Sequence, residues 1–305
     1  MAKLTDEQFS AYLAEAKAKL SAELPIAAEK KINYGYQYTA KLAEAKLTLN
    51  IYNGKKGLNI VYSGDSALAE RAAALLEGRK AQAVAPATFV TDGLWAGSDE
   101  SGKGDFFGSL VVAAVVVDNT TADKLRAAGV KDCKLLTDKK ILELEDIIKA
   151  SVVDYSVLEL KPRVYNLRYE QVAAQGGKLN QLLGYGHVAA LSKVLEKHED
   201  CHSALIDQFT TSMVNIRALK QRFPQCDVRQ QPKAESNLAV AAASVLARAQ
   251  FLHTMAALAA EAGVQELPKG GGAQATACAR ELAAKYGKEA LRNYVKLHFA
   301  NYQRV

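Results

Sequence analysis

Two adjacent carboxylates, Asp99 and Glu100, stand at the end of a predicted buried strand and run directly into a glycine-rich turn. The segment reads Gly97-Ser98-Asp99-Glu100-Ser101-Gly102-Lys103-Gly104-Asp105. Glycines at 102 and 104 let the backbone adopt positive φ and bring its amides close to a ligand, and Lys103 adds a positive charge beside two negative ones. The combination indicates a metal ion held beside a phosphodiester. An Asp-Glu pair before glycine is also common in surface turns, where both acids are simply solvated.

Two more acids are candidates for the same site. Asp207 ends a short apolar strand at 203–206, and the ligands of open α/β sheets lie where strands end. Glu235 falls at the first turn of an alanine-rich helix at 238–248, which could pack close to the sheet and bring this acid toward the strand ends. Each acid also has a plainer explanation, since Asp207 could cap the next element and Glu235 could complement the helix dipole. Spacing alone leaves open whether the four acids converge.

Four converging carboxylates would have a defined chemistry. Such groups repel one another and are tolerated together when divalent cations neutralise them. Hard oxygen ligands suit Mg²⁺ or Mn²⁺, and two such ions about 4 Å apart can activate water and stabilise the leaving oxygen in phosphodiester hydrolysis. The four cysteines, at 133, 201, 226 and 278, are far apart in the sequence. They form no Cys/His cluster for zinc, and we expect free thiols in a reducing compartment.

The acids require a sheet whose strands end at one place, and the surrounding sequence predicts such a sheet. Residues 110–117 form a continuous run of β-branched residues and alanine, as expected for a strand buried on both faces. Strands are predicted near 94–99, 109–117, 151–160 and 203–207, and helices near 138–150, 178–197, 235–258 and 274–286. This succession predicts a mixed α/β sheet flanked by helices.

The first 80 residues have a different sequence pattern. Period-two alternation predicts strands at 30–38, 45–52 and 58–62 with a hairpin turn at 53–57, and helices are predicted at 5–21, with Thr5 as N-cap, and at 66–76. Tyrosines and lysines share these strands, which is typical of nucleic-acid-binding sheets because rings stack on bases or sugars and ammonium groups meet phosphates. The tyrosines are Tyr34, Tyr36, Tyr38, Tyr52 and Tyr62, and the candidate contacts are Tyr34, Tyr36, Lys55 and Lys56. Alternatively, tyrosine merely favours strands and lysine protects sheet edges.

Length and charge narrow the class of protein. The 305 residues suit two domains, which we predict at 1–80 and 94–305 with a linker at 81–93. The net charge of +6 favours a polyanionic partner. The longest wholly apolar run, 110–117, is too short to span a bilayer, and the first residues contain no apolar signal core. We therefore expect a cytoplasmic protein without a membrane partner, and a monomer by default.

An ordered series of motifs closely resembles the ribonuclease HIII family, a type 2 ribonuclease H. The glycine-rich segment at 97–105 opens the series. It continues with Lys131-Asp132-Cys133-Lys134-Leu135-Leu136-Thr137-Asp138, Tyr165-Asn166, Asn180-Gln181-Leu182-Leu183 with Gly186-His187, Ile206-Asp207-Gln208-Phe209, Lys233-Ala234-Glu235-Ser236, Ala242-Ala243-Ser244 with Ala247-Arg248, Leu267-Pro268-Lys269-Gly270 and Lys296-Leu297-His298-Phe299-Ala300-Asn301. The N-terminal unit looks like the family's small α+β substrate-binding domain, which is similar to the TATA-box-binding protein and which ribonuclease HII lacks.

The resemblance implies an RNase H-like fold and endonucleolytic cleavage of the RNA strand in RNA–DNA hybrids, leaving 5′-phosphate and 3′-hydroxyl ends. The family's metal-binding quartet maps onto Asp99, Glu100, Asp207 and Glu235. The turn Ser101-Gly102-Lys103-Gly104 would contact substrate, with its glycine backbone reading a ribose 2′-hydroxyl and Lys103 meeting a phosphate. Lys134 and Lys269 are weaker phosphate-binding candidates. Two alternatives stay open, namely ribonuclease HII-like incision at single ribonucleotides embedded in DNA, and a hybrid-binding protein without catalysis.

Two departures from the family pattern concern residues beside the site. Cys133 stands where serine is expected, so a hydroxyl contact there is in doubt, and the run Gly270-Gly271-Gly272 is unusually rich in glycine. Outside the quartet, we interpret His187 as a packed or polar-face helix histidine rather than a ligand, His298 as structural and Trp95 as part of the core.

Overall fold

The computed structural model describes residues 4–42, 45–54, 57–77, 89, 91–210, 212–232 and 234–305. The chain divides into two compact units, Met1–Ala87 and Thr88–Val305, each with its own hydrophobic core. Most of the predicted linker at 81–93 lies outside the described residues, as do Lys55 and Lys56. The domain boundaries at 80 and 94 therefore stay predictions.

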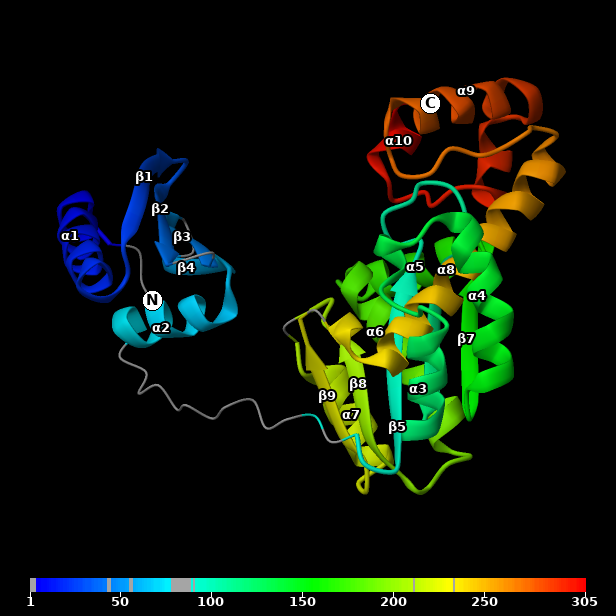
Figure 1. Cartoon of the computed structure of the whole chain (residues 1–305). Coiled ribbons are helices and arrows are strands. Elements are labelled where there is room, and N and C mark those ends of the chain that lie inside the picture. Colours follow the sequence, from blue (N-terminus) through cyan, green and yellow to red (C-terminus); the bar gives the residue numbers. More distant parts are fainter. Residues whose placement is uncertain are drawn as a thin grey trace. The chain divides into compact units, whose positions relative to one another are not determined.

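The N-terminal unit is a four-stranded antiparallel sheet with two helices packed on one face (Figure 1). Its elements are α1 (Asp6–Glu23), β1 (Ile26–Ile32), β2 (Gly35–Leu42), β3 (Ala45–Gly54), β4 (Gly57–Gly64) and α2 (Ser66–Glu77). Thr5 is the N-cap of α1, as predicted, and forms a reciprocal capping box with Gln8. Leu13, Leu20 and Leu49 are among the side chains buried between the helices and the sheet.

The prediction of one continuous strand at 30–38 is wrong. The period-two segment at 30–38 is a hairpin, in which Ile32 of β1 pairs with Gly35 of β2 around a two-residue turn. Alternation runs through such a turn without interruption, so it cannot reveal the reversal. Tyr34 occupies the turn with φ 64°, and Gly35 begins β2 where a Cβ would lie 2.0 Å from the carbonyl oxygen of Ile51.

The C-terminal unit is a mixed five-stranded sheet in the order β7-β6-β5-β8-β9, which confirms the predicted α/β class. The strands are β5 (Leu94–Ser101), β6 (Leu110–Val117), β7 (Asp154–Leu160), β8 (Cys201–Asp207) and β9 (Asp227–Gln231). The helices are α3 (Asn119–Ala127), α4 (Asp138–Ser151), α5 (Pro162–Ala174), α6 (Leu179–Leu195), α7 (Val214–Arg222), α8 (Leu238–Ala262), α9 (Ala273–Tyr286) and α10 (Ala300–Gln303), with 3₁₀ segments at Cys133–Leu135, Ala234–Ser236 and Lys288–Asn293.

Helices cover both faces of this sheet. Odd-numbered residues of β6, such as Val111 and Val115, belong to a core shared with α3, α4 and α8, whereas even-numbered residues, such as Val112 and Val116, belong to a core shared with α6 and α7. Every residue of β6 is buried, which explains its uninterrupted apolar sequence. Side chains that alternate along β5 therefore enter two different environments.

The central helix α8 is the longest element of this unit and lies against the sheet (Figure 1). Its mean hydropathy of 1.3 over 18 residues and its length would suit a membrane span, but 72% of that window is buried inside the protein. The sequence analysis found α8 but missed β9, α3, α5, α7 and α10. The five residues of β9 include one fully buried apolar side chain, Val228, so they carry no strong alternation.

Gly97 permits the close approach of α8 to β5. A Cβ at this position would lie 2.2 Å from the backbone nitrogen of Val240 and 2.4 Å from the carbonyl carbon of Ala239. Backbone atoms cannot rotate away, so a side chain here would have to push the helix from the sheet.

We predict that Gly97→Ala lowers the free energy of unfolding by at least about 2 kcal/mol, because overpacking against backbone forces a shift of α8. Gly272→Ala is the matched control, since a Cβ there meets nothing within 4 Å and its φ is −76°. The control should change stability by less than about 1 kcal/mol. Urea-induced unfolding measures both, and equal effects of the two substitutions would contradict the explanation.

Candidate active site

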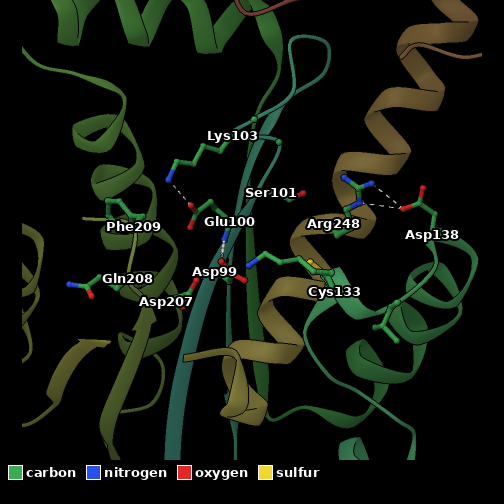
Figure 2. A pocket seen from close by; sticks show the side chains of 14 residues that line it. Asp99, Glu100, Ser101, Lys103, Cys133, Asp138, Asp207, Gln208, Phe209 and Arg248 are labelled. Atoms are coloured by element: carbon green, nitrogen blue, oxygen red, sulfur yellow. Dashed lines mark hydrogen bonds and ion pairs between the residues drawn. The ribbon is translucent and has the colours of Figure 1, made fainter. Parts of the chain in front are cut away.

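Parallel pairing of β5 with β8 brings two predicted acids together near the carboxyl ends of these strands. Ser98 pairs with Ile206, so the next residues, Asp99 and Asp207, lie side by side on these two neighbouring strands (Figure 2). The Asp99 Oδ1 atom accepts a hydrogen bond from the backbone N–H of Glu100 at 2.7 Å. The Asp207 Oδ1 atom accepts one from the backbone N–H of Ala234 at 3.1 Å. Each aspartate therefore has one oxygen held by a fixed backbone donor.

Asp99 and Glu100 are neighbours in sequence but face opposite sides of the sheet. Asp99 pairs with Ala113, which belongs to the core on the α8 side, whereas Glu100 pairs with Val112, which belongs to the core on the α6 side. On that side the Glu100 Oε2 atom lies 3.1 Å from Nε2 of His187, and Oε1 lies 3.6 Å from Nζ of Lys103.

Glu235 joins the cluster from a third element. It lies in the 3₁₀ turn Ala234–Ser236, directly before α8, and it is half-buried. Ala234 fixes the turn through its hydrogen bond to Asp207, and Asn237 caps α8 by accepting the backbone N–H of Ala239 at 3.0 Å. The Asn237 side chain also accepts the indole N–H of Trp95 at 3.3 Å, so the buried Trp95 helps anchor the start of α8.

The carboxylates perturb one another. Burial and the charges of Glu100 and Asp207 raise the pKa of Asp99 well above its usual range. Burial and the charge of Glu235 likewise raise the pKa of Asp207. Burial alone would raise the pKa of Glu100 too, but hydrogen bonding to His187 and the charge of Lys103 lower it overall. These shifts show that all four acids lie within electrostatic range of the cluster.

Lys134 lies among these acids. Burial alone would lower its pKa, but the charges of Asp132, Asp99, Glu235 and Asp207 together raise it. Asp132 also accepts the backbone N–H of Lys134 at 3.1 Å, which holds the 3₁₀ turn Cys133–Leu135 beside the site. One ammonium group thus partly offsets three of the four carboxylates.

The donor set fits a hard divalent cation. Carboxylates that raise one another's pKa values bind a cation in place of protons, and oxygen donors select Mg²⁺ or Mn²⁺. Among the described residues, no group of three or more His, Cys, Asp or Glu side chains is already gathered tightly enough to hold one ion. The chemistry of the site therefore fits, while its carboxylates must draw closer together around an ion.

A cavity of about 590 Å³ opens over the acids. Asp99, Glu100 and Asp207 line it, together with the turn at 101–104 and Lys134, whereas Glu235 lies outside its lining (Figure 2). At its border Arg248 and Lys269 both pair with Asp138, so neither cation is free of an acidic partner.

The glycine-rich turn depends on one glycine more than on the other. Gly102 has φ +84°, and a Cβ there would lie 2.1 Å from the carbonyl oxygen of Ser109. Gly104 has an ordinary φ and open space around it, so the expectation of positive φ at both positions is wrong for Gly104. Open space at Gly104 instead keeps the backbone accessible to a ligand.

A buried lysine that the sequence analysis did not single out fixes the end of this turn. Lys296 is fully buried, and its ammonium donates to the carbonyl oxygens of Asp105 at 2.8 Å and Gly108 at 2.7 Å. Asp105 in turn accepts the backbone N–H of Gly270 at 2.6 Å. In Figure 1 the segment between β5 and β6 reaches toward the orange and red C-terminal elements. The signal was present in the motif at 296–301, but a lysine in a tail resembles a surface residue.

The two departures from the family pattern have structural explanations. Cys133 lines the cavity, and burial raises the pKa of its thiol to about 11, so it is neutral at physiological pH. Its backbone N–H donates to Ser244 at 3.1 Å. Within the glycine run, Gly270 has φ +75°, and a Cβ on Gly271 would press within 3.4 Å of Asn301 and Phe299.

Comparisons with known proteins identify the family of this chain. The family model described as Ribonuclease HII matches residues 96–302. Ribonuclease HIII of Chlamydia pneumoniae is 38% identical over 211 residues, which cover 68% of this chain and 69% of that protein. The enzyme of Protochlamydia amoebophila is 38% identical over 203 residues, covering 67% of this chain and 65% of that protein, slightly less than two thirds of its length. The chain is a member of the ribonuclease HII family, of the ribonuclease HIII type.

The likeness to a solved ribonuclease HIII extends over both units. The crystal structure of Bst-RNase HIII in complex with Mn²⁺ has a TM-score of 0.64 and 29% identity, and the alignment covers 99% of this chain and 96% of that one. Ribonuclease H3 of Aquifex aeolicus gives a TM-score of 0.55 at 25% identity, with 97% and 98% covered. The N-terminal unit is thus part of the resemblance to the ribonuclease HIII type.

Two histidines of the C-terminal unit have different surroundings. The His298 ring packs at a tilt against the rings of Tyr165 and Tyr169, and burial lowers its pKa to about 4, which fits the structural role predicted for it. His187 is fully buried, as the interpretation as a packed histidine requires, yet it touches Glu100 of the predicted quartet. The sequence analysis missed this contact because α6 is distant from β5 in the sequence.

The N-terminal tyrosines do not form the open platform that their spacing indicated. Three of them lie on the helix-covered face of the sheet, because each pairs directly with a core residue of β3. These are Tyr36, Tyr38 and Tyr62. Tyr34 is 80% exposed in the β1–β2 turn, and Tyr52 faces the open side. The alternation of the side chains was predicted correctly, but the sequence did not show which of the two alternating sets faces the solvent.

We predict that Asp99→Asn raises stability at neutral pH in the presence of a chelator. Because the folded-state pKa of Asp99 is raised, the wild type loses stability as pH rises from the unfolded value of about 3.9 through the folded value. Asparagine has no such loss, so the stability advantage of the variant should be larger at about pH 8 than at about pH 4. Urea unfolding at both pH values tests this, and a difference that does not vary with pH would contradict it.

Proposed function

We propose that this protein cleaves the RNA strand of RNA–DNA hybrids by metal-assisted phosphodiester hydrolysis and leaves 5′-phosphate and 3′-hydroxyl ends. The observation that carries the proposal is the side-by-side placement of Asp99 and Asp207 on β5 and β8, with Glu100 and Glu235 in electrostatic range. Similarity over nearly the whole chain to a ribonuclease HIII that was solved with Mn²⁺ supports it.

Asp99, Glu100, Asp207 and Glu235 are the proposed holders of Mg²⁺ or Mn²⁺. When bound there, such ions activate a water molecule and stabilise the charge that develops on the leaving oxygen. The protein orients two of these ligands, because one oxygen of Asp99 and one of Asp207 are held by backbone N–H groups.

The glycine-rich turn is the proposed reader of the ribose. Backbone groups of Ser101, Gly102 and Gly104 line the cavity beside the acids, where a 2′-hydroxyl could exchange hydrogen bonds with them. Lys103 and Lys134 line the same cavity and are the proposed partners of the substrate phosphates. Lys296 supports this function indirectly, since its hydrogen bonds fix the carbonyl groups that follow the turn.

The open face of the N-terminal sheet is a second proposed nucleic-acid contact. Its described strand positions carry three lysines, Lys30, Lys41 and Lys46, and no acid, and Tyr52 lies on the same face. Lys41 and Lys46 are directly opposite each other across β2 and β3. Like charges in such a pair are unfavourable, and an anion such as a phosphate would relieve the repulsion.

We predict that Asp99→Asn slows cleavage of a uniform RNA–DNA hybrid by at least about a hundredfold with either metal, while hybrid binding changes little. The control is Asp154→Asn, a surface acid at the start of β7 that pairs with Lys197. Electrophoresis of the cut RNA strand, with metal and with chelator, measures the rates. Cleavage at the wild-type rate by Asp99→Asn would exclude the assigned site.

The same assay separates the alternatives. A duplex that contains one ribonucleotide in DNA should be cut much less efficiently than the uniform hybrid. Preference for the single ribonucleotide would support a ribonuclease HII-like activity instead, and tight binding without cutting under either metal would support a binding protein.

We predict that replacing Lys41 and Lys46 together by alanine weakens hybrid binding and lowers the slope of log affinity against log salt by about 1 to 2, because up to two phosphate contacts are lost. Lys19→Ala on α1 is the control, since Lys19 pairs with Glu15 on the helix surface away from the open face. Binding titrations at several salt concentrations measure the slope. An unchanged slope would exclude this face as a contact.

The wider setting is also part of the proposal. We propose a cytoplasmic, monomeric enzyme whose partner is the nucleic acid itself, in keeping with its net charge of +6.

A further inference from the structure

The buried histidine on α6 carries an inference beyond the metal-binding quartet. His187 is completely buried, and its two ring nitrogens have different partners. Nε2 lies 3.1 Å from Oε2 of Glu100, and Nδ1 lies 2.6 Å from Oγ of Ser98. Ser98 and Glu100 are two residues apart on β5, so both point to the face of the sheet that α6 covers.

Each acid on a strand of this site has one oxygen held by a nitrogen donor. For Asp99 and Asp207 the donor is a backbone N–H, at 2.7 Å and 3.1 Å. Glu100 has a longer side chain and one more rotatable bond, and its Oε2 atom is held by a side-chain donor, His187, at 3.1 Å. The histidine therefore does for the glutamate what the backbone does for the two aspartates.

The ring of His187 is fixed in position from several sides. It stacks on Phe209, which follows Asp207 by two residues, with ring centroids 4.8 Å apart and an interplanar angle of 7°. Its neighbour Gly186 lets α6 lie close to the sheet, because a Cβ there would be 2.8 Å from a methyl group of Val112. A ring held in this way can transmit its orientation to the carboxylate.

The partners also determine the tautomer of a neutral ring. A carboxylate only accepts, so Nε2 carries the hydrogen and donates it to Glu100. Nδ1 is then an acceptor, and the buried Ser98 hydroxyl donates to it. The result is a directional chain from Ser98 through His187 to Glu100, which leaves Oε1 of Glu100 on the side of Lys103, where both residues line the cavity.

We propose that His187 is a positioning residue for the metal site, which it serves by holding Glu100 in the orientation that presents one carboxylate oxygen to the cation, with Ser98 selecting the tautomer. This inference rests on the proposed function only in taking Glu100 as a metal ligand. Partners that orient metal ligands in this way typically contribute about 10- to 100-fold to metal affinity or activity.

Three variants separate hydrogen bonding from packing. His187→Phe keeps an aromatic ring for the stack on Phe209 but removes the donor, and Ser98→Ala added to it removes the hydroxyl that would otherwise lose its partner. His187→Gln retains an N–H near the place of Nε2. His253→Gln is the matched control, because His253 also contacts a glutamate, Glu145, at 2.6 Å but lies outside the lining of the cavity.

The first readout is direct Mn²⁺ binding by calorimetry without substrate. The Ser98→Ala, His187→Phe double variant should bind Mn²⁺ at least about 10-fold more weakly, whereas His187→Gln should stay within about 3-fold of the wild type. The control should match the wild type. Equal Mn²⁺ affinity of a folded double variant and the wild type would overturn the proposal, and so would a glutamine variant as weak as the phenylalanine variant.

A second readout needs no variant and therefore does not depend on whether substitutions fold. Nitrogen-15 NMR of the histidine rings in the wild-type chain should find His187 with its hydrogen on Nε2 and a bare Nδ1. A hydrogen on Nδ1 with a bare Nε2 would overturn the proposed chain. Neither readout uses cleavage. A wild type whose Mn²⁺ affinity depends on His187 but that cuts no hybrid would therefore contradict the proposed function and leave this inference standing.

Discussion

The parallel pairing of β5 with β8 is the constraint on which the site depends. It is the one register that brings Asp99 beside Asp207, and the repulsion between them is part of what raises the pKa of Asp99. Two neighbouring elements illustrate how the site is built around this pairing. Gly97 lets α8 lie against β5, and the hydrogen bond from Ala234 to Asp207 attaches the turn that carries Glu235.

The site spans both faces of the sheet because two adjacent acids point in opposite directions. Asp99 meets Lys134 and the 3₁₀ turn on the α8 side, whereas Glu100 meets His187 on the α6 side. An arrangement of this kind ties the chemistry to the packing of two separate cores. It also explains why glycines occur where helices approach the strands, since bulkier residues would move one wall of the site.

Buried charged and polar groups outside the quartet support it at fixed points. Lys296 holds the carbonyl groups after the glycine-rich turn, and burial lowers its pKa to about 7. Its hydrogen bonds to backbone oxygens compensate part of the cost of burying an ammonium group. The C-terminal segment thus contributes to the loop that follows β5, although about 190 residues separate them.

The amino-acid sequence by itself determined the four acids, the period of the strands and the buried character of residues 110–117, because residue types and local periodicity are visible in one dimension. Tertiary structure decided what depends on pairing between distant segments. It determined that alternation at 30–38 hides a hairpin and that Tyr36 faces the helices. It also determined that His187 reaches Glu100 and that Lys296 is buried. Such contacts join residues that are far apart in the sequence, and local sequence patterns do not show which distant residues meet.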